Sequence, residues 1–143
     1  MKRMELVTLA LVLTLFTTGA ASAQEGSAPV PNPVSSTVKT QLTRYAKNMV
    51  AAADLMPAEK YSFKPTPEMS TFGHLILHIA QSNNVLCSKI SGQTAPDAKL
   101  ADSDPKDKLV AGLKASFEFC GTALANVDDS KLGEPLMLGN RPS

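Results

Sequence analysis

The sequence predicts an all-α domain, a small helix bundle that follows a leader for export. Three stretches of the 143-residue chain repeat apolar residues at spacings of three and four, as amphipathic helices do. Proline and glycine punctuate the segments between them, and no stretch alternates apolar and polar residues strongly enough for a strand. Three such stripes can close a small bundle, but the long connectors between them favour a four-helix bundle.

The N-terminus has the pattern of a secretory signal peptide over residues 1–23. Lys2 and Arg3 precede an apolar run at 6–16, and Ala21-Ser22-Ala23 supplies the small residues of a cleavage site. The apolar run is too short to span a bilayer well. We therefore expect cleavage after Ala23, export, and no membrane partner once the leader is removed.

The charge of the expected mature chain is balanced. Removing Lys2, Arg3 and Glu5 from the 14 basic and 13 acidic residues leaves 12 of each. A neutral chain without a cluster of basic residues lacks the basic patch that binds nucleic acid or anionic lipid, so we expect no nucleic-acid partner.

The first predicted helix follows a flexible spacer at residues 24–34, which is rich in small, polar and proline residues. The helical domain is expected over 35–143, with Ser35 or Ser36 as the N-cap of the helix. Pro57 ends the helix. Its apolar stripe consists of Val38, Leu42, Tyr45, Met49, Ala52 and Met56.

The second predicted helix follows a connector from Pro57 to Met69 that holds three prolines and is expected to run extended. Ser70 or Thr71 is the expected N-cap, and Gly92 is the C-terminal stop after a helix that reaches about Ile90. We expect a buried stripe of Phe72, Leu75, Ile76, Ile79, Leu86 and Ile90.

The third predicted helix begins after a polar, turn-like segment at 91–103. Ser103 or Asp104 followed by Pro105 is typical of a helix start. The tail at 128–143 contains glycine and proline and is too short for another long helix. The expected buried face of this third helix is Leu109, Leu113, Phe117, Cys120, Leu124 and Val127.

The two histidines of the chain, His74 and His78, both lie on the second predicted helix. At about 100° per residue, His78 falls at the border of the buried arc and His74 mostly toward solvent. Their i,i+4 spacing would let both reach one ion. However, Leu75 follows His74 where a zinc-protease helix has glutamate. From spacing alone, His74 is a solvated surface residue and His78 a boundary residue hydrogen-bonded to a neighbour.

Two segments resemble the DinB-like superfamily, in its exported subgroup. They are the stretch MPAEKYSFKPTPEMSTFGHLILHIA, which starts at Met56, and SFEFCGTAL at 116–124. The likeness covers the chain from about Thr37 onward. It implies a four-helix bundle in up-down-down-up order, of which this sequence contains three helices. Members with complete sites hold zinc or nickel through three histidines, one on the second helix and two on the fourth.

The resemblance implies that His78, not His74, is the metal ligand on the second helix. The other two ligands belong to a fourth helix, which would begin about where this sequence stops, so we expect a truncated, metal-site-deficient member without activity of its own. Its uncovered apolar groove would favour a homodimer. The alternative is a divalent-metal-dependent enzyme, similar to thiol S-transferases, if a longer parent supplies that helix. No catalytic residue is assigned, because no nucleophile–base pair could act without the metal.

The two cysteines, Cys87 and Cys120, are either small buried apolar residues or a disulfide, which an oxidising compartment would permit. A tight antiparallel helix pair would separate them by about 20 Å, beyond the ~7 Å limit between Cα atoms. Parallel helices would bring them together, and the 91–103 segment can reach about 43 Å, enough to recross a helix. The resemblance implies the parallel order and hence a bridge.

Overall fold

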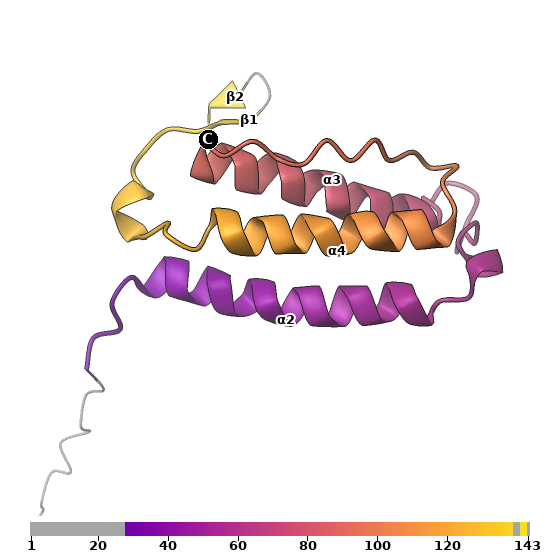
Figure 1. Cartoon of the computed structure of the whole chain (residues 1–143), viewed down its shortest axis with the longest axis horizontal. Coiled ribbons are helices and arrows are strands. Elements are labelled where there is room, and N and C mark those ends of the chain that lie inside the picture. The colour runs from indigo at the N-terminus through magenta and orange to yellow at the C-terminus, as the bar shows by residue number, and fades with distance from the viewer. Residues whose placement is uncertain (1–27, 139–140, 143) are drawn as a thin grey trace, which may run out of the picture. The chain divides into compact units, whose positions relative to one another are not determined.

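Three α-helices form the described part of the chain, which comprises residues 28–138 and 141–142 of a computed structural model. They are α2 (Pro33–Leu55), α3 (Phe72–Ser91) and α4 (Lys106–Ala123). α2 runs in one direction, and α3 and α4 run in the other (Figure 1). The all-α bundle predicted from the sequence is confirmed. The signal peptide predicted over 1–23 lies outside the described residues.

The smaller elements belong to the connector and the tail. A 3-10 turn, η1 (Ala58–Lys60), follows α2, and another, η2 (Asp129–Lys131), follows α4. Two-residue strands β1 (Met137–Leu138) and β2 (Arg141–Pro142) pair antiparallel, a ribbon that the sequence did not predict. Among the described residues, none of the helices has the length and hydropathy required to cross a bilayer.

The ends of α3 are those that the sequence predicted. The Thr71 hydroxyl oxygen accepts a hydrogen bond from the backbone N–H of His74 at 3.0 Å, and Gly92 ends the helix with φ of 73°. Inside the first turn, the backbone N–H of Gly73 donates to the carbonyl oxygen of Tyr61 at 2.8 Å. A Cβ at Gly73 would lie 3.3 Å from that oxygen, so this close approach favours glycine.

The predicted starts of the other two helices need correction. α2 begins two residues before Ser35, with Asn32 as N-cap and Pro33 in the first turn, where its missing N–H costs no hydrogen bond. α4 begins at Lys106 after Pro105, and neither Ser103 nor Asp104 caps it. The Asp104 carboxylate accepts a hydrogen bond from the N–H of Ala101 instead.

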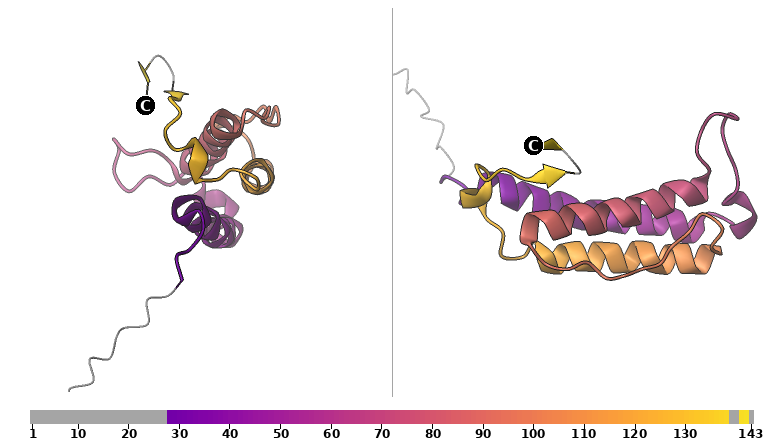
Figure 2. Two further views of the ribbon diagram at one scale, coloured as in Figure 1. Left: turned by 90° about the vertical axis from the view of Figure 1, so that its left-hand side faces the viewer. Right: turned by 90° about the horizontal axis from the view of Figure 1, so that it is seen from above.

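The core lies along α4, which packs against both α2 and α3. Viewed along the bundle, the three helices occupy the corners of a triangle (Figure 2). The predicted face of α4 is confirmed, with Val127 only partly buried. The buried residues of that face are Leu109, Leu113, Phe117, Cys120 and Leu124.

The predicted stripe of α3 is wrong for half of its members. Leu75, Leu86 and Ile90 are 47%, 44% and 42% exposed. The apolar arc of α3 is wide enough to face two neighbours, and α4 covers only one side of it. The predicted stripe of α2 is also partly uncovered, at Val38, Tyr45 and Ala52. The residues of α3 that are buried are Gly73, Ile76, Leu77, Ala80 and Cys87.

Candidate functional site

An apolar surface, which we call the open face, remains uncovered on α2 and α3. Val34 and Val38 of α2 and Ile90 of α3 line a common pocket, which joins the two helices at one end of the surface. On α3 the surface includes Leu75 near the start of the helix and Val85, Leu86 and Ile90 near its end, where Leu138 of β1 lines a second pocket. At 3.6 residues per turn these four residues share one side of the helix. The exposed apolar residues of the open face are Val34, Val38, Tyr45, Leu75, Val85, Leu86 and Ile90.

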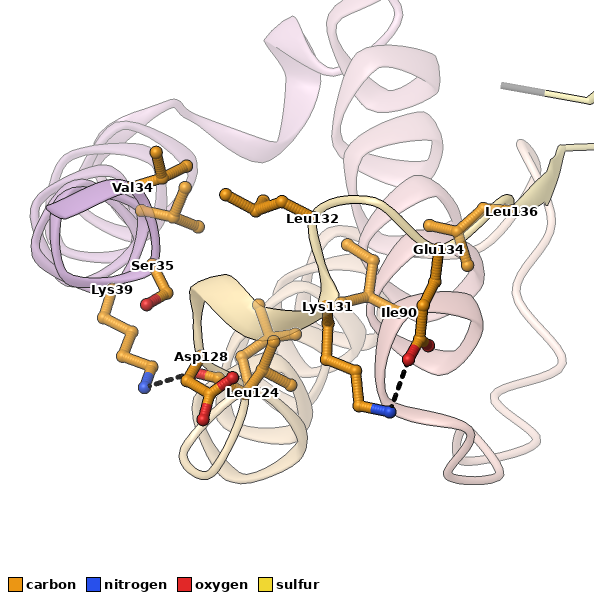
Figure 3. A pocket seen from close by; sticks show the side chains of 12 residues that line it. Val34, Ser35, Lys39, Ile90, Leu124, Asp128, Lys131, Leu132, Glu134 and Leu136 are labelled. Carbon is orange, nitrogen blue, oxygen red and sulfur yellow. Dashed lines mark hydrogen bonds and ion pairs between the residues drawn. The ribbon is translucent and has the colours of Figure 1, made fainter. Parts of the chain in front are cut away.

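The pocket at the end of the open face has a volume of about 340 Å³ and is lined mainly by aliphatic side chains (Figure 3). Leu132 of the tail forms part of its wall. The cations at its rim already have partners. Lys131 Nζ lies 2.7 Å from Glu134 Oε1, and Lys39 Nζ donates to the carbonyl oxygens of Ala125 and Val127. The pocket therefore suits apolar side chains better than a charged group.

The carboxylate of Asp129 links the tail to the start of α2 by hydrogen bonds. Asp129 accepts hydrogen bonds from the backbone N–H groups of Val34 and Ser35, at 3.0 Å and 2.8 Å. Burial raises the pKa of Asp129, but these N–H donors and the nearby charge of Lys39 outweigh it and hold the pKa below its usual range. Asp129 acts as an N-terminal cap supplied from far along the chain, which no local spacing in the sequence could have revealed.

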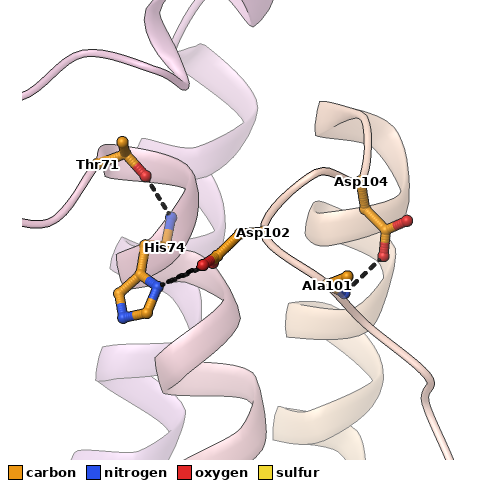
Figure 4. A network of polar contacts seen from close by, with 5 residues as sticks. All are labelled: Thr71, His74, Ala101, Asp102 and Asp104. Carbon is orange, nitrogen blue, oxygen red and sulfur yellow. Dashed lines mark hydrogen bonds and ion pairs between the residues drawn. The ribbon is translucent and has the colours of Figure 1, made fainter.

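His74 is more involved in packing than its helical-wheel position predicted. Its Nδ1 lies 2.8 Å from Asp102 Oδ1 and 3.0 Å from Oδ2 (Figure 4). Asp102 belongs to the segment between α3 and α4, and the side chain of His74 is 43% exposed. The contact between His74 and Asp102 could not be predicted, because the spacing of residues in the sequence does not determine where that segment lies along α3.

His78 is exposed, not at the border of the core. The prediction failed because α3 turns the arc around Ile76 and Ala80 toward α4, which carries His78 away from the contact. Among the described residues, the ring of His78 stacks with the ring of His74. The ring centroids are 6.4 Å apart and the planes 3° apart.

The metal set implied by the resemblance needs three histidines, and the chain has two. Within residues 28–138 and 141–142, no group of three or more His, Cys, Asp or Glu residues is placed to hold an ion. The described residues therefore do not assemble the family's three-histidine site.

Cys87 and Cys120 are joined in a disulfide, with 5.3 Å between their Cα atoms. The bond links α3 and α4 near their C-terminal ends, so these helices run parallel. Cys120 is fully buried and Cys87 is 6% exposed. The segment 92–105 returns along the outside of the bundle between the two helices (Figure 2).

Comparison with known proteins gives the family. No curated protein and no solved structure matches the chain significantly. A sequence model described as the DinB superfamily matches residues 41–142, which include most of α2 and all of α3 and α4. The chain belongs to the DinB superfamily.

Proposed function

We propose that this chain is an exported DinB-like module that works by binding a helix on its open face, without catalysis of its own. The observation that carries the proposal is the row of exposed apolar residues on α2 and α3, with Leu86 44% and Val38 48% exposed. Exposed apolar surface bounded by two helices is the usual receptor for the apolar side of an amphipathic helix.

The charges of α2 and α3 favour a partner helix with acidic flanks. Apart from Lys39, whose ammonium group is hydrogen-bonded within the chain, the two helices carry three basic residues and one acidic residue: Arg44, Lys47, Lys89 and Asp54. The tail of this chain, which lines the end of the open face, has the complementary character, since three acidic residues outnumber Lys131 between Asp128 and Glu134. A second copy would instead bring basic helices against basic helices, which costs free energy. The expected homodimer is therefore an outcome of the test and not the proposal.

The test uses a fluorescent synthetic peptide with leucines on one helical face and glutamates beside them. A matched peptide carries lysines in place of the glutamates. We expect the glutamate peptide to bind the mature chain at least about tenfold more tightly than the lysine peptide. Leu86→Glu should weaken binding to a similar extent. Leu55→Glu is the matched control, because Leu55 is 83% exposed and lies outside the open face.

Equal affinity for both peptides, or no binding of either, would contradict the proposal. So would equal effects of Leu86→Glu and Leu55→Glu in chains that circular dichroism shows to be folded. Concentration-dependent self-association that Leu86→Glu abolishes, without peptide binding, would assign the open face to a second copy and overturn the acidic-helix proposal.

A second candidate function is that of a divalent-metal-dependent enzyme, similar to thiol S-transferases, completed by a helix from a longer parent. The observation in its favour is that His78 is exposed one turn beyond Leu75, on the side of α3 that carries the open face. A docked helix with two histidines would then meet His78. Stoichiometric zinc or nickel in a longer parent, lost on His78→Ala but retained on His74→Ala, would support this candidate.

A further inference from the structure

We propose that His74 and His78 together chelate a divalent transition-metal ion, with Asp102 as the carboxylate that positions His74. This donor set differs from the three-histidine set of the family, because it uses His74 and needs no fourth helix. It does not require a helix on the open face, although His78 lies on that side of α3. The two rings lie on successive turns of α3, stacked with 6.4 Å between centroids.

The geometry allows both imidazoles to reach one ion. Zn–N bonds are about 2.0–2.1 Å long, so two nitrogens on one ion lie about 3–3.5 Å apart. The rings must approach each other to reach that distance, and most of the movement falls to His78, because Asp102 holds the ring of His74. His78 is exposed, and the side chain of His74 is 43% exposed. A helical i,i+4 pair places its side chains on one face, one turn apart.

Asp102 makes this pair more than two neighbouring histidines. Metal-bound histidines usually donate their second ring N–H to a carboxylate, which fixes the tautomer and the ring orientation. Here Asp102 lies 2.8 Å from His74 Nδ1, which leaves Nε2 for the ion. Asp102 is itself held in place, because Asp104 accepts a hydrogen bond from the N–H of Ala101 (Figure 4). Asp104 also pairs with Lys108 at 2.9 Å.

The donors select the class of ion. Imidazole nitrogen suits Zn²⁺, Ni²⁺ and Cu²⁺, whereas Mg²⁺ and Ca²⁺ take oxygen ligands. Cu²⁺ should bind most tightly, following the general order of affinities for such sites. Two protein ligands leave several coordination positions to water, so the bound ion would stay open to exchange with small external ligands.

The test is calorimetric titration of the mature chain with Cu²⁺, Zn²⁺ and Mg²⁺. One equivalent of Cu²⁺ or Zn²⁺ should bind, and Mg²⁺ should not. His74→Ala and His78→Ala should each weaken binding at least about tenfold. Asp102→Asn should weaken it about tenfold, which a purely structural contact would not do. Gln81→Ala, an exposed change on the same helix, is the control.

A second readout keeps the proposal falsifiable if a variant loses stability. Electron paramagnetic resonance of the Cu²⁺-loaded wild-type chain should report two coordinating nitrogens of the imidazole type. One such nitrogen would overturn the chelate. So would unchanged affinity in folded His74→Ala, because a site that includes His78 but not His74 is a different site. No binding of Cu²⁺ or Zn²⁺ by the wild-type chain would also overturn it.

Discussion

The two sides of α3 have similar hydrophobic character but different surroundings. On one side, Ile76, Ala80 and Cys87 are buried against α4, with 4%, 1% and 6% exposed. On the other, Leu75, Leu86 and Ile90 remain at the surface, each more than 40% exposed. Apolar periodicity thus identifies residues that are suited to burial, while burial itself requires a neighbour that covers them.

The disulfide and the polar contacts that join the elements of the molecule follow the same division. The disulfide holds α3 to α4, and Asp102 on His74 ties the returning segment to α3. The Asp129 cap binds the tail to α2. On the open face, the cations near the pocket are occupied within the chain, which leaves the apolar strip for a partner. Stability and binding should therefore depend on different residues.

The largest expected contrast is between a leucine of the core and a leucine of the open face. Leu113 has no exposed surface, and Leu86 is 44% exposed. Leu113→Ala should lower the free energy of unfolding by about 2.7–5 kcal/mol, because it removes buried methyl groups and leaves a cavity. Leu86→Ala should cost less than about 1 kcal/mol in the isolated chain. Urea denaturation of both variants measures the contrast, and equal losses would mean that the open face is covered.

The sequence predicted the helices themselves better than the way in which they pack against one another. The ends of α3 depend on local chemistry, the Thr71 cap and the left-handed Gly92, so the residues themselves carry the information. The placement of His78 failed because the rotation of α3 is decided by its contact with α4. Asp102 and Asp129 act across 28 and 94–95 positions of the sequence, and no periodic pattern records pairings of that range.

The next contrast concerns the covalent bond on the packed side of α3. The disulfide closes a loop with a sequence separation of 33 residues. Loss of the bond in the double variant Cys87→Ala/Cys120→Ala should cost about 2–4 kcal/mol, mainly through the greater freedom of the unfolded chain. Urea denaturation measures it, and the reduced wild-type chain controls for the altered packing. Equal stability of the oxidised and reduced chains would contradict this expectation.

Two glycines of α4 provide a smaller, matched contrast between covered and uncovered surface. A Cβ at Gly121 would meet nothing within 4 Å, so Gly121→Ala should stabilise the helix by about 0.5–1 kcal/mol. A Cβ at Gly112 would overlap the side chain of Leu100, which packs there from the returning segment. Gly112→Ala should therefore lose that gain or destabilise the chain. Equal stabilisation in thermal unfolding would show that Leu100 leaves Gly112 uncovered.

The smallest expected effect is a dependence on pH at the tail. The pKa of Asp129 is held below its usual range, so its cap stabilises the fold fully above the usual value of about 3.9. That contribution is lost as the pH falls through the lowered pKa of the folded state. Asp129→Asn should reduce stability at pH 7, and the difference from wild type should shrink as the pH drops below about 4. Asp97→Asn, an exposed change in the returning segment, is the control. A constant difference between wild type and Asp129→Asn from pH 7 to pH 2 would mean that the carboxylate charge has no part in capping α2.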